Sequence, residues 1–316
     1  MGRRAFSLIE LIAVLSIAGV MLSLLLLGVQ AARSSARKFQ CQNSIRQCGL
    51  ALANAESANK KYPAFENGYY RPKRLGEYSL YSVHNELLPY LECTKIPYED
   101  LGFADDLGPV FPYSDRCPTF SCPDENVSTG TSYRVNIGTG VNATPSVKTP
   151  QNGNGAFVAL RQLTSRDFAD GISLTVAFSE RTKGKGPSKS DQFHPHLYVP
   201  HGGMTIDEIL QITFSSDSLQ YPSAGWSIRA GSMRHTGYTH AVLPNSDTDD
   251  VLFCSSLSVY VNSCWAGLIP ARSHHNGGVN VTMMDCSVHF IANTVDISVW
   301  QAIATRASHD TVTLSN

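Results

Sequence analysis

Eight cysteines are the residues of this sequence with the clearest capacity for covalent chemistry. In an exported domain, cysteines in this number are typical of disulfides. Their spacing predicts two local cross-links, one between Cys117 and Cys122 and one between Cys254 and Cys264. No Cys-x-x-Cys pair is present, so the sequence does not predict a zinc site.

Two further cysteines, Cys41 and Cys48, lie in a segment with helical periodicity. Seven helical residues span about 10.5 Å, which exceeds the roughly 7 Å between Cα atoms that a disulfide tolerates. These two cysteines therefore cannot pair with each other. Cys93 and Cys286 are open partners for them.

Two groups of histidines are alternative positions for a metal. His194, His196 and His201 lie in a segment punctuated by prolines, which favours surface histidines over a metal chelate. His274 and His275 precede a glycine pair, and we expect them in the turn that enters a hairpin rather than in an active site.

Asp247, Asp249 and Asp250 could coordinate calcium, but the glycine and the closing glutamate of a strong calcium loop are missing. A solvated acidic loop is the favoured interpretation, with calcium as the alternative. We expect no other cofactor and no metal site. The sequence contains no Gly-x-Ser-x-Gly, phosphate loop or dinucleotide fingerprint, so we assign no catalytic residue and expect no enzyme, an anchored exported hydrolase being a minor alternative.

Among the structural elements that must position the cysteines, histidines and aspartates, the N-terminal segment is the most informative. Residues 6–29 form a run of 24 mostly apolar residues, long enough as a helix to span a hydrocarbon layer of about 30 Å. A single carboxylate, Glu10, lies at its start, and such residues in a membrane span are costly and usually functional. The run exceeds the length of a secretory signal, although Ala31-Ala32 offers a late cleavage site. A simple anchor is the alternative.

The sequence Arg-Arg-Ala-Phe-Ser-Leu-Ile-Glu-Leu at residues 3–11 resembles the leader of a type IV prepilin. The resemblance implies a leader of residues 1–5, cleavage between Ala5 and Phe6 by a prepilin peptidase and methyltransferase, and N-methylation of Phe6. Glycine is the usual residue before the cut, where this chain has Ala5. The resemblance also implies a single-pass protein of the inner membrane, with a cytoplasmic N-terminus and a head that is periplasmic or extracellular.

Glu10 stands fifth in the implied mature chain. Inside a bundle of apolar helices an unpaired carboxylate requires a cation or a donor. The partner that the resemblance implies is the Phe6 amine of a neighbouring subunit, and this pair would fix the axial register between subunits. The alternative is that Glu10 extends to the membrane interface.

The helical pattern continues beyond the apolar run. Between residues 30 and 60 there is no proline, and apolar residues recur with helical spacing at Cys41, Ile45, Cys48, Leu52 and Ala55. We therefore expect one helix over residues 6–60, with a transmembrane segment of about residues 6–29 followed by an amphipathic stalk. Basic residues flank the apolar run on both sides, so the positive-inside rule gives no orientation.

Residues 61–316 are expected to form one exported, β-rich head, which makes the fold class α+β and pilin-like, with the long helix packed on the head. Alternation predicts a hairpin of residues 279–283 and 287–291 with a turn at residues 284–286. A buried strand is predicted at residues 173–180, one helical turn at residues 163–168 and a closing helix at residues 295–307.

A second resemblance covers most of the chain. It rests on six segments, residues 40–52, 120–124, 131–139, 170–180, 273–280 and 285–291. Together they look like a family of large bacterial prepilin-like proteins whose head is a domain of unknown function. The chain departs from the family at Cys286, where glycine is usual in the hairpin turn, and at Gly28, where proline is common.

These observations favour a structural pilin-like or pseudopilin subunit of a type IV pilus or a type II secretion-like assembly. Its expected partners are other pilin-like subunits, bound through the N-terminal helix, and the lipid bilayer. With 25 basic and 26 acidic residues, the chain has no nucleic-acid footprint. The alternative is a membrane-anchored binding or adhesion protein that does not polymerise and recognises a ligand through residues 136–155 and 184–204.

Overall fold

The fold is α+β, as the sequence predicts: a long N-terminal helix and a β-rich head. The computed structural model describes residues 8–70, 78–93, 103–104, 108–109, 117–125, 129–140, 153–183, 225, 227–229, 231–248, 250–254 and 264–309. It divides into two compact units, Met1–Gln40 and Cys41–Asn316, and the boundary falls inside the first helix.

Helix α1 (Leu8–Asn59) is continuous over 52 residues. Its second half carries the predicted apolar stripe, and the stripe is buried: Cys41, Ile45, Cys48, Leu52 and Ala55. The helix ends at Asn59 because Lys60 adopts a left-handed conformation, with φ of 59°, and Pro63 follows.

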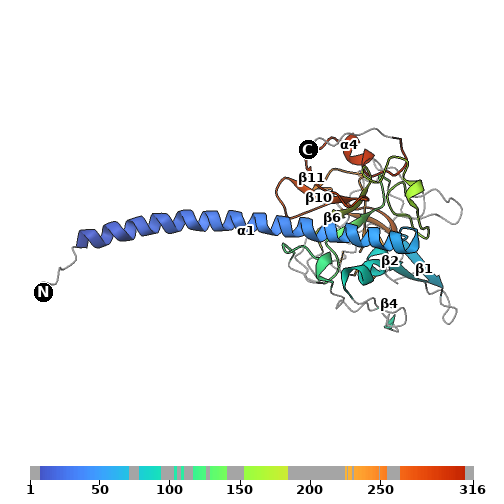
Figure 1. The fold of residues 1–316 in the computed structure, drawn as a ribbon, viewed down its shortest axis with the longest axis horizontal. Coiled ribbons are helices and arrows are strands. Elements are labelled where there is room, and N and C mark those ends of the chain that lie inside the picture. The colour runs from blue at the N-terminus through green and yellow to red at the C-terminus, as the bar shows by residue number, and fades with distance from the viewer. Residues whose placement is uncertain are drawn as a thin grey trace, which may run out of the picture. The chain divides into compact units, whose positions relative to one another are not determined.

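The core of the head is a five-stranded sheet in the order β11-β10-β6-β5-β7. Its strands are β5 (Tyr133–Asn136), β6 (Val176–Glu180), β7 (Gly237–Tyr238), β10 (Gly278–Met283) and β11 (Val288–Ala292). Neighbouring strands are antiparallel except for the parallel pair β5 and β7. The strands β6, β10 and β11 are labelled in Figure 1.

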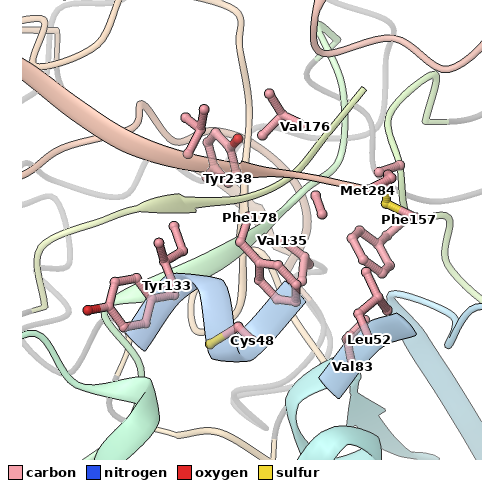
Figure 2. Close-up of a cluster of buried hydrophobic side chains, with 14 of the residues drawn as sticks. Cys48, Leu52, Val83, Tyr133, Val135, Phe157, Val176, Phe178, Tyr238 and Met284 are labelled. Carbon is pink, nitrogen blue, oxygen red and sulfur yellow. The ribbon is translucent and has the colours of Figure 1, made fainter. Parts of the chain in front are cut away.

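The second half of α1 packs directly on this sheet. The Tyr133 hydroxyl of β5 donates a hydrogen bond to the Cys41 carbonyl at 3.2 Å, and the Thr282 hydroxyl of β10 donates to the Ile45 carbonyl at 3.1 Å. Figure 2 shows Cys48 and Leu52 in the same buried cluster as sheet residues such as Phe178. Each large apolar side chain buried there contributes about 1.5–3 kcal/mol.

Gly49 permits this close approach. A Cβ atom at Gly49 would lie 2.6 Å from the Cγ2 atom of Thr282 and 3.3 Å from the Cα atom of Cys286. The first distance is shorter than a van der Waals contact allows. Glycine at this position therefore lets α1 lie against the β10–β11 hairpin.

The predicted hairpin is confirmed as β10 and β11, and its turn closes through a hydrogen bond from the Cys286 amide to the Met283 carbonyl at 3.0 Å. Cys286 adopts φ of 71°, the left-handed region that glycine occupies most readily. A side chain there costs about 1–3 kcal/mol. The turn geometry is thus kept in this chain, and the backbone strain falls on Cys286.

The other predicted elements are present but shorter. The strand predicted at residues 173–180 is β6. The closing helix is α4 (Ile297–Ala302), capped by the Asp296 side chain, and it ends where the Ile303 carbonyl accepts the Val176 amide of β6 at 2.8 Å. The helical turn predicted at residues 163–168 is the 3-10 helix η4 (Ser165–Asp167).

Smaller elements complete the head. In the part of the chain that the structure describes, three antiparallel pairs lie outside the main sheet: β1 (Glu66–Tyr70) with β2 (Tyr78–Ser82), β3 (Phe103–Ala104) with β4 (Gly108–Pro109), and β8 (Val251–Cys254) with β9 (Cys264–Leu268). Short helices are α2 (Val83–Leu87), η1 (Leu88–Leu91) and η3 (Pro118–Phe120).

Candidate functional site

The first half of α1 is an apolar surface. All residues from 8 to 37 are exposed, including the large apolar side chains between Leu8, 75% exposed, and Val29, 44% exposed. Soluble monomers rarely expose contiguous apolar surface on this scale, and such surface marks a protein or membrane interface. Within the described residues, α1 is the helix that is long and apolar enough to cross a membrane.

The polar groups of this segment are largely satisfied by the helix itself. The Ser16 hydroxyl donates to the Ile12 carbonyl at 2.8 Å, and the Ser23 hydroxyl donates to the Val20 carbonyl at 2.7 Å. Such internal bonds are what an apolar environment requires. Glu10 is then the one charged side chain of residues 6–29.

Glu10 lies exposed on the first turns of α1. Ala5 and Phe6, at the predicted cleavage and methylation site, lie outside the described residues. Cleavage, methylation and the pairing of Glu10 with a neighbouring Phe6 amine therefore stay predictions.

Among the described residues there are two disulfides, and they correct the predicted pairing of Cys117 with Cys122. Cys41 of α1 bonds to Cys122, and Cys93 bonds to Cys117. The sequence places Cys117 and Cys122 on either side of η3, whose Phe120 is buried, so the two cysteines meet different partners. As predicted, Cys41 does not pair with Cys48, which is buried as a free thiol.

The other predicted disulfide joins β8 and β9. The strand register makes Cys254 and Cys264 backbone partners. The side chains of both residues lie outside the part that the structure describes, so this bond stays a prediction. Of the two open partners expected for the helical cysteines, Cys93 instead bonds to Cys117, and Cys286 is a free thiol.

A polar cluster surrounds the Cys41–Cys122 disulfide. The Nε2 atom of His275 lies 3.9 Å from the Cys122 sulfur and 3.2 Å from the Oε1 atom of Glu180. The other ring nitrogen, Nδ1, faces the Asp124 carboxylate at 3.4 Å. His275 is thus held between two carboxylates beside the disulfide.

Glu180 is fixed at the end of β6 by the neighbouring strand. Asn280 of β10 donates its backbone amide to Oε2 at 2.8 Å and its side-chain amide to Oε1 at 2.9 Å. Gln42, the residue after Cys41 on α1, donates to the Asn280 side-chain carbonyl at 3.0 Å. One helix and two strands therefore set the position of the carboxylate.

A second carboxylate, Glu125, lies at the edge of this region. It accepts the Lys183 amide at 2.9 Å, and its other oxygen lies 3.7 Å from the Nε2 atom of His274. This contact raises the pKa of His274. Burial lowers the pKa of Lys183 to about 8, although its ammonium donates to the Ser121 hydroxyl at 2.7 Å.

Four side chains of this region form a donor set for a metal ion when Cys41 and Cys122 are thiolates rather than a disulfide. The sulfurs of Cys41 and Cys122, the His275 imidazole and a Glu180 oxygen all lie within 4.8 Å of one another. We call these four residues the Cys41 cluster. The sequence did not reveal it because its members come from α1, the segment after η3, β6 and the turn before β10; His275 does stand in that turn, as predicted.

Of the aspartates proposed as a solvated acidic loop, Asp247 is exposed and Asp250 is buried. Asp250 is buried and forms an ion pair with Arg181, and Arg272 lies 3.7 Å from its other oxygen. The prediction of a solvated loop is wrong for Asp250 because guanidinium groups compensate its charge inside the protein. Asp249 lies outside the described residues, and so do residues 141–152 and 184–204, which include His194, His196 and His201.

The chain matches a known protein family over most of its length. The sequence pattern of a family described as a protein of unknown function (DUF1559) matches residues 30–298. No curated protein and no solved structure matches the chain. The match covers the second half of α1 and most of the head, and it does not include the apolar N-terminal segment or its Glu10.

Proposed function

The chain belongs to this family of unknown function, DUF1559, and from that premise we propose that it is a membrane-anchored pilin-like subunit that assembles with other subunits through α1. The family is associated in bacteria with pilin-like proteins. The match begins at residue 30, so it is independent of the prepilin-like motif at residues 3–11.

One observation carries the proposal: residues 8–29 of α1 form an exposed apolar helix with a single carboxylate. A plain anchor has no use for a charge in its first turns, where the carboxylate adds to the cost of insertion. In a helix that assembles with others, the charge has a role, because one ion pair between subunits excludes other axial registers. The Phe6 amine of a neighbouring subunit is the proposed partner.

The disulfides support an exported head. Disulfides persist in oxidising compartments, and Cys41, which follows the apolar segment on α1, is cross-linked to Cys122. Because basic residues flank the apolar segment on both sides, charge alone gave no orientation. The covalent bond favours a cytoplasmic N-terminus with residues from Cys41 onward outside the cytoplasm, in a pilus or a secretion pseudopilus.

We assign the chain a structural role rather than a catalytic one. Its polar cluster is organised around a disulfide, and His275 is held by carboxylates on both ring nitrogens. The prepilin peptidase, other pilin-like subunits and the lipid bilayer are its proposed partners.

The test is replacement of Glu10 by glutamine and by alanine, with Glu56→Gln as the matched control on the same helix. We expect both Glu10 variants to insert into the membrane and to lose subunit cross-linking and filament assembly, and the control to keep both. Normal assembly without the carboxylate would contradict the register role and favour a tethered protein that does not polymerise.

Mass spectrometry of the purified N-terminus tests the processing step separately. We expect a chain that begins at N-methylated Phe6. An intact Met1, or cleavage near Ala32, would exclude prepilin processing.

A further inference from the structure

We propose that the Cys41 cluster binds a zinc-class divalent cation when its two cysteines are thiols, and that disulfide formation releases the cation. The four ligand atoms come from separate parts of the chain and lie within 4.8 Å of one another. Two thiolates, one imidazole and one carboxylate form a donor set that suits tetrahedral zinc. The proposal does not rest on subunit assembly through the first half of α1.

The residues around the cluster already orient its ligands. Asp124 faces the Nδ1 atom of His275 at 3.4 Å, which leaves the Nε2 atom for a cation on the side of Cys122 and Glu180. A carboxylate on the far nitrogen of a ligating histidine is the usual support of a zinc site.

The carboxylate ligand is positioned in the same way. The Asn280 amide holds the Oε2 atom of Glu180 at 2.8 Å, and Oε1 points toward His275 at 3.2 Å. Glu180 is 2% exposed, and a buried carboxylate is stabilised by a cation in contact with it. In the disulfide form the imidazole meets this carboxylate directly.

The backbone spacing suits both states of the cysteines. The Cα atoms of Cys41 and Cys122 are 5.2 Å apart. Reduction allows the two sulfurs to separate by rotation about the Cα–Cβ bonds, without movement of the backbone. Because Cys41 is fully buried and Cys122 is 7% exposed, a cation bound there is shielded from water.

The two states interconvert by balanced steps. Binding of the cation to the dithiol displaces the two thiol protons and forms two metal–sulfur bonds. A disulfide oxidant then accepts two electrons from the thiolates by thiol–disulfide exchange: its S–S bond breaks, its two sulfurs leave as thiolates that take up two protons from water, and the Cys41–Cys122 bond forms. The metal–sulfur bonds break, and the cation leaves without changing its oxidation state.

The experiment titrates the full chain in detergent with cobalt(II), whose thiolate charge-transfer absorption reports sulfur ligation. The Cys93→Ser/Cys117→Ser variant is the matched background, because it removes the Cys93–Cys117 disulfide and leaves the cluster intact. After anaerobic reduction we expect one cobalt ion per chain, displaced by zinc. After oxidation with a low-molecular-weight disulfide we expect the cobalt signal to disappear.

Two further substitutions in the same background assign the ligands. Cys122→Ser should abolish the thiolate absorption, and Asp124→Asn should weaken cobalt affinity roughly 10- to 100-fold without removing it. Binding that is unchanged in Cys122→Ser, or absent from the reduced background protein, would overturn the proposal.

If the background protein unfolds when it is reduced, its refolding tests the metal site instead. Near-ultraviolet circular dichroism follows refolding of the reduced background protein with zinc and with a chelator. Zinc-dependent refolding that Cys122→Ser lacks supports the site, and refolding that is the same under both conditions, without cobalt binding, contradicts it.

Discussion

Both halves of α1 are helical, but their side chains have opposite environments. Residues 8–37 are all exposed, although most of those up to Val29 are apolar. From Cys41 to Ala55, by contrast, the apolar stripe is buried against the sheet. The second half thus finds its apolar partner within its own chain. The exposed apolar surface of the first half is the part that the proposed function assigns to lipid and to other subunits.

The largest expected difference between the halves is in packing energy. Ile45→Ala should lower the free energy of unfolding of the head by about 2–5 kcal/mol, because Ile45 is fully buried. Leu25→Ala, at a site 62% exposed, should leave that free energy unchanged. Chemical denaturation followed by tryptophan fluorescence measures both.

For subunit assembly, the expected order of effects of Ile45→Ala and Leu25→Ala is reversed. If α1 assembles through its first half, Leu25→Ala is the variant that weakens cross-linking between subunits at an unchanged head stability. A destabilised head in Leu25→Ala would show that this half packs on its own chain.

Two glycines of α1 lie in different surroundings. Gly49→Ala should destabilise the head by about 1–3 kcal/mol, because the added Cβ atom meets Thr282 at 2.6 Å. At Gly19 nothing lies within 4 Å of a Cβ atom, so Gly19→Ala should instead favour the helix by about 1 kcal/mol. Thermal unfolding of the head and the helix content by circular dichroism separate the two effects, and equal responses would contradict the close approach at Gly49.

Acid sensitivity should belong to the second unit, since residues 1–40 contain no histidine. Burial lowers the pKa of His84 to about 4 and that of His240 to about 3, from 6.5. Between pH 6.5 and about 4 the unfolded chain therefore binds protons that the folded head does not. The free energy of unfolding should therefore decrease as the pH is lowered through this window, by up to about 1.4 kcal/mol per pH unit for each histidine.

His84→Gln tests this slope. Glutamine can still donate to the Tyr133 carbonyl, which lies 2.6 Å from the Nε2 atom of His84, but it does not titrate. Denaturation across the window should show a shallower loss of stability than in the unsubstituted chain. An identical slope would mean that His84 takes up its proton in the folded head as well.

Local periodicity predicted the structural elements that are determined by residues close together in the sequence. The buried stripe of α1 and the β10–β11 hairpin follow from spacings of three and four and from alternation. The disulfide partners could not be predicted in this way, because Cys41 and Cys122 are 81 positions apart in the sequence and only the folded chain brings them together.

The buried charges were missed for a related reason. A sequence shows Asp250 as one of several acidic residues near a turn, and only the folded chain places it beside Arg181 and Arg272. Likewise His275 reads as a turn residue, and it lies in the turn, yet Glu180 and Asp124 approach it from distant segments.

The Cys41–Cys122 bond also bears on mechanical strength. Tension applied along α1 would first reach the head at Cys41, the residue where the second unit begins. Noncovalent contacts and hydrogen bonds can break one after another under such a load, whereas a covalent bond stays intact. The cross-link therefore fastens the helix to the segment after η3, so that a pull on the helix is carried into the body of the head before its stripe detaches.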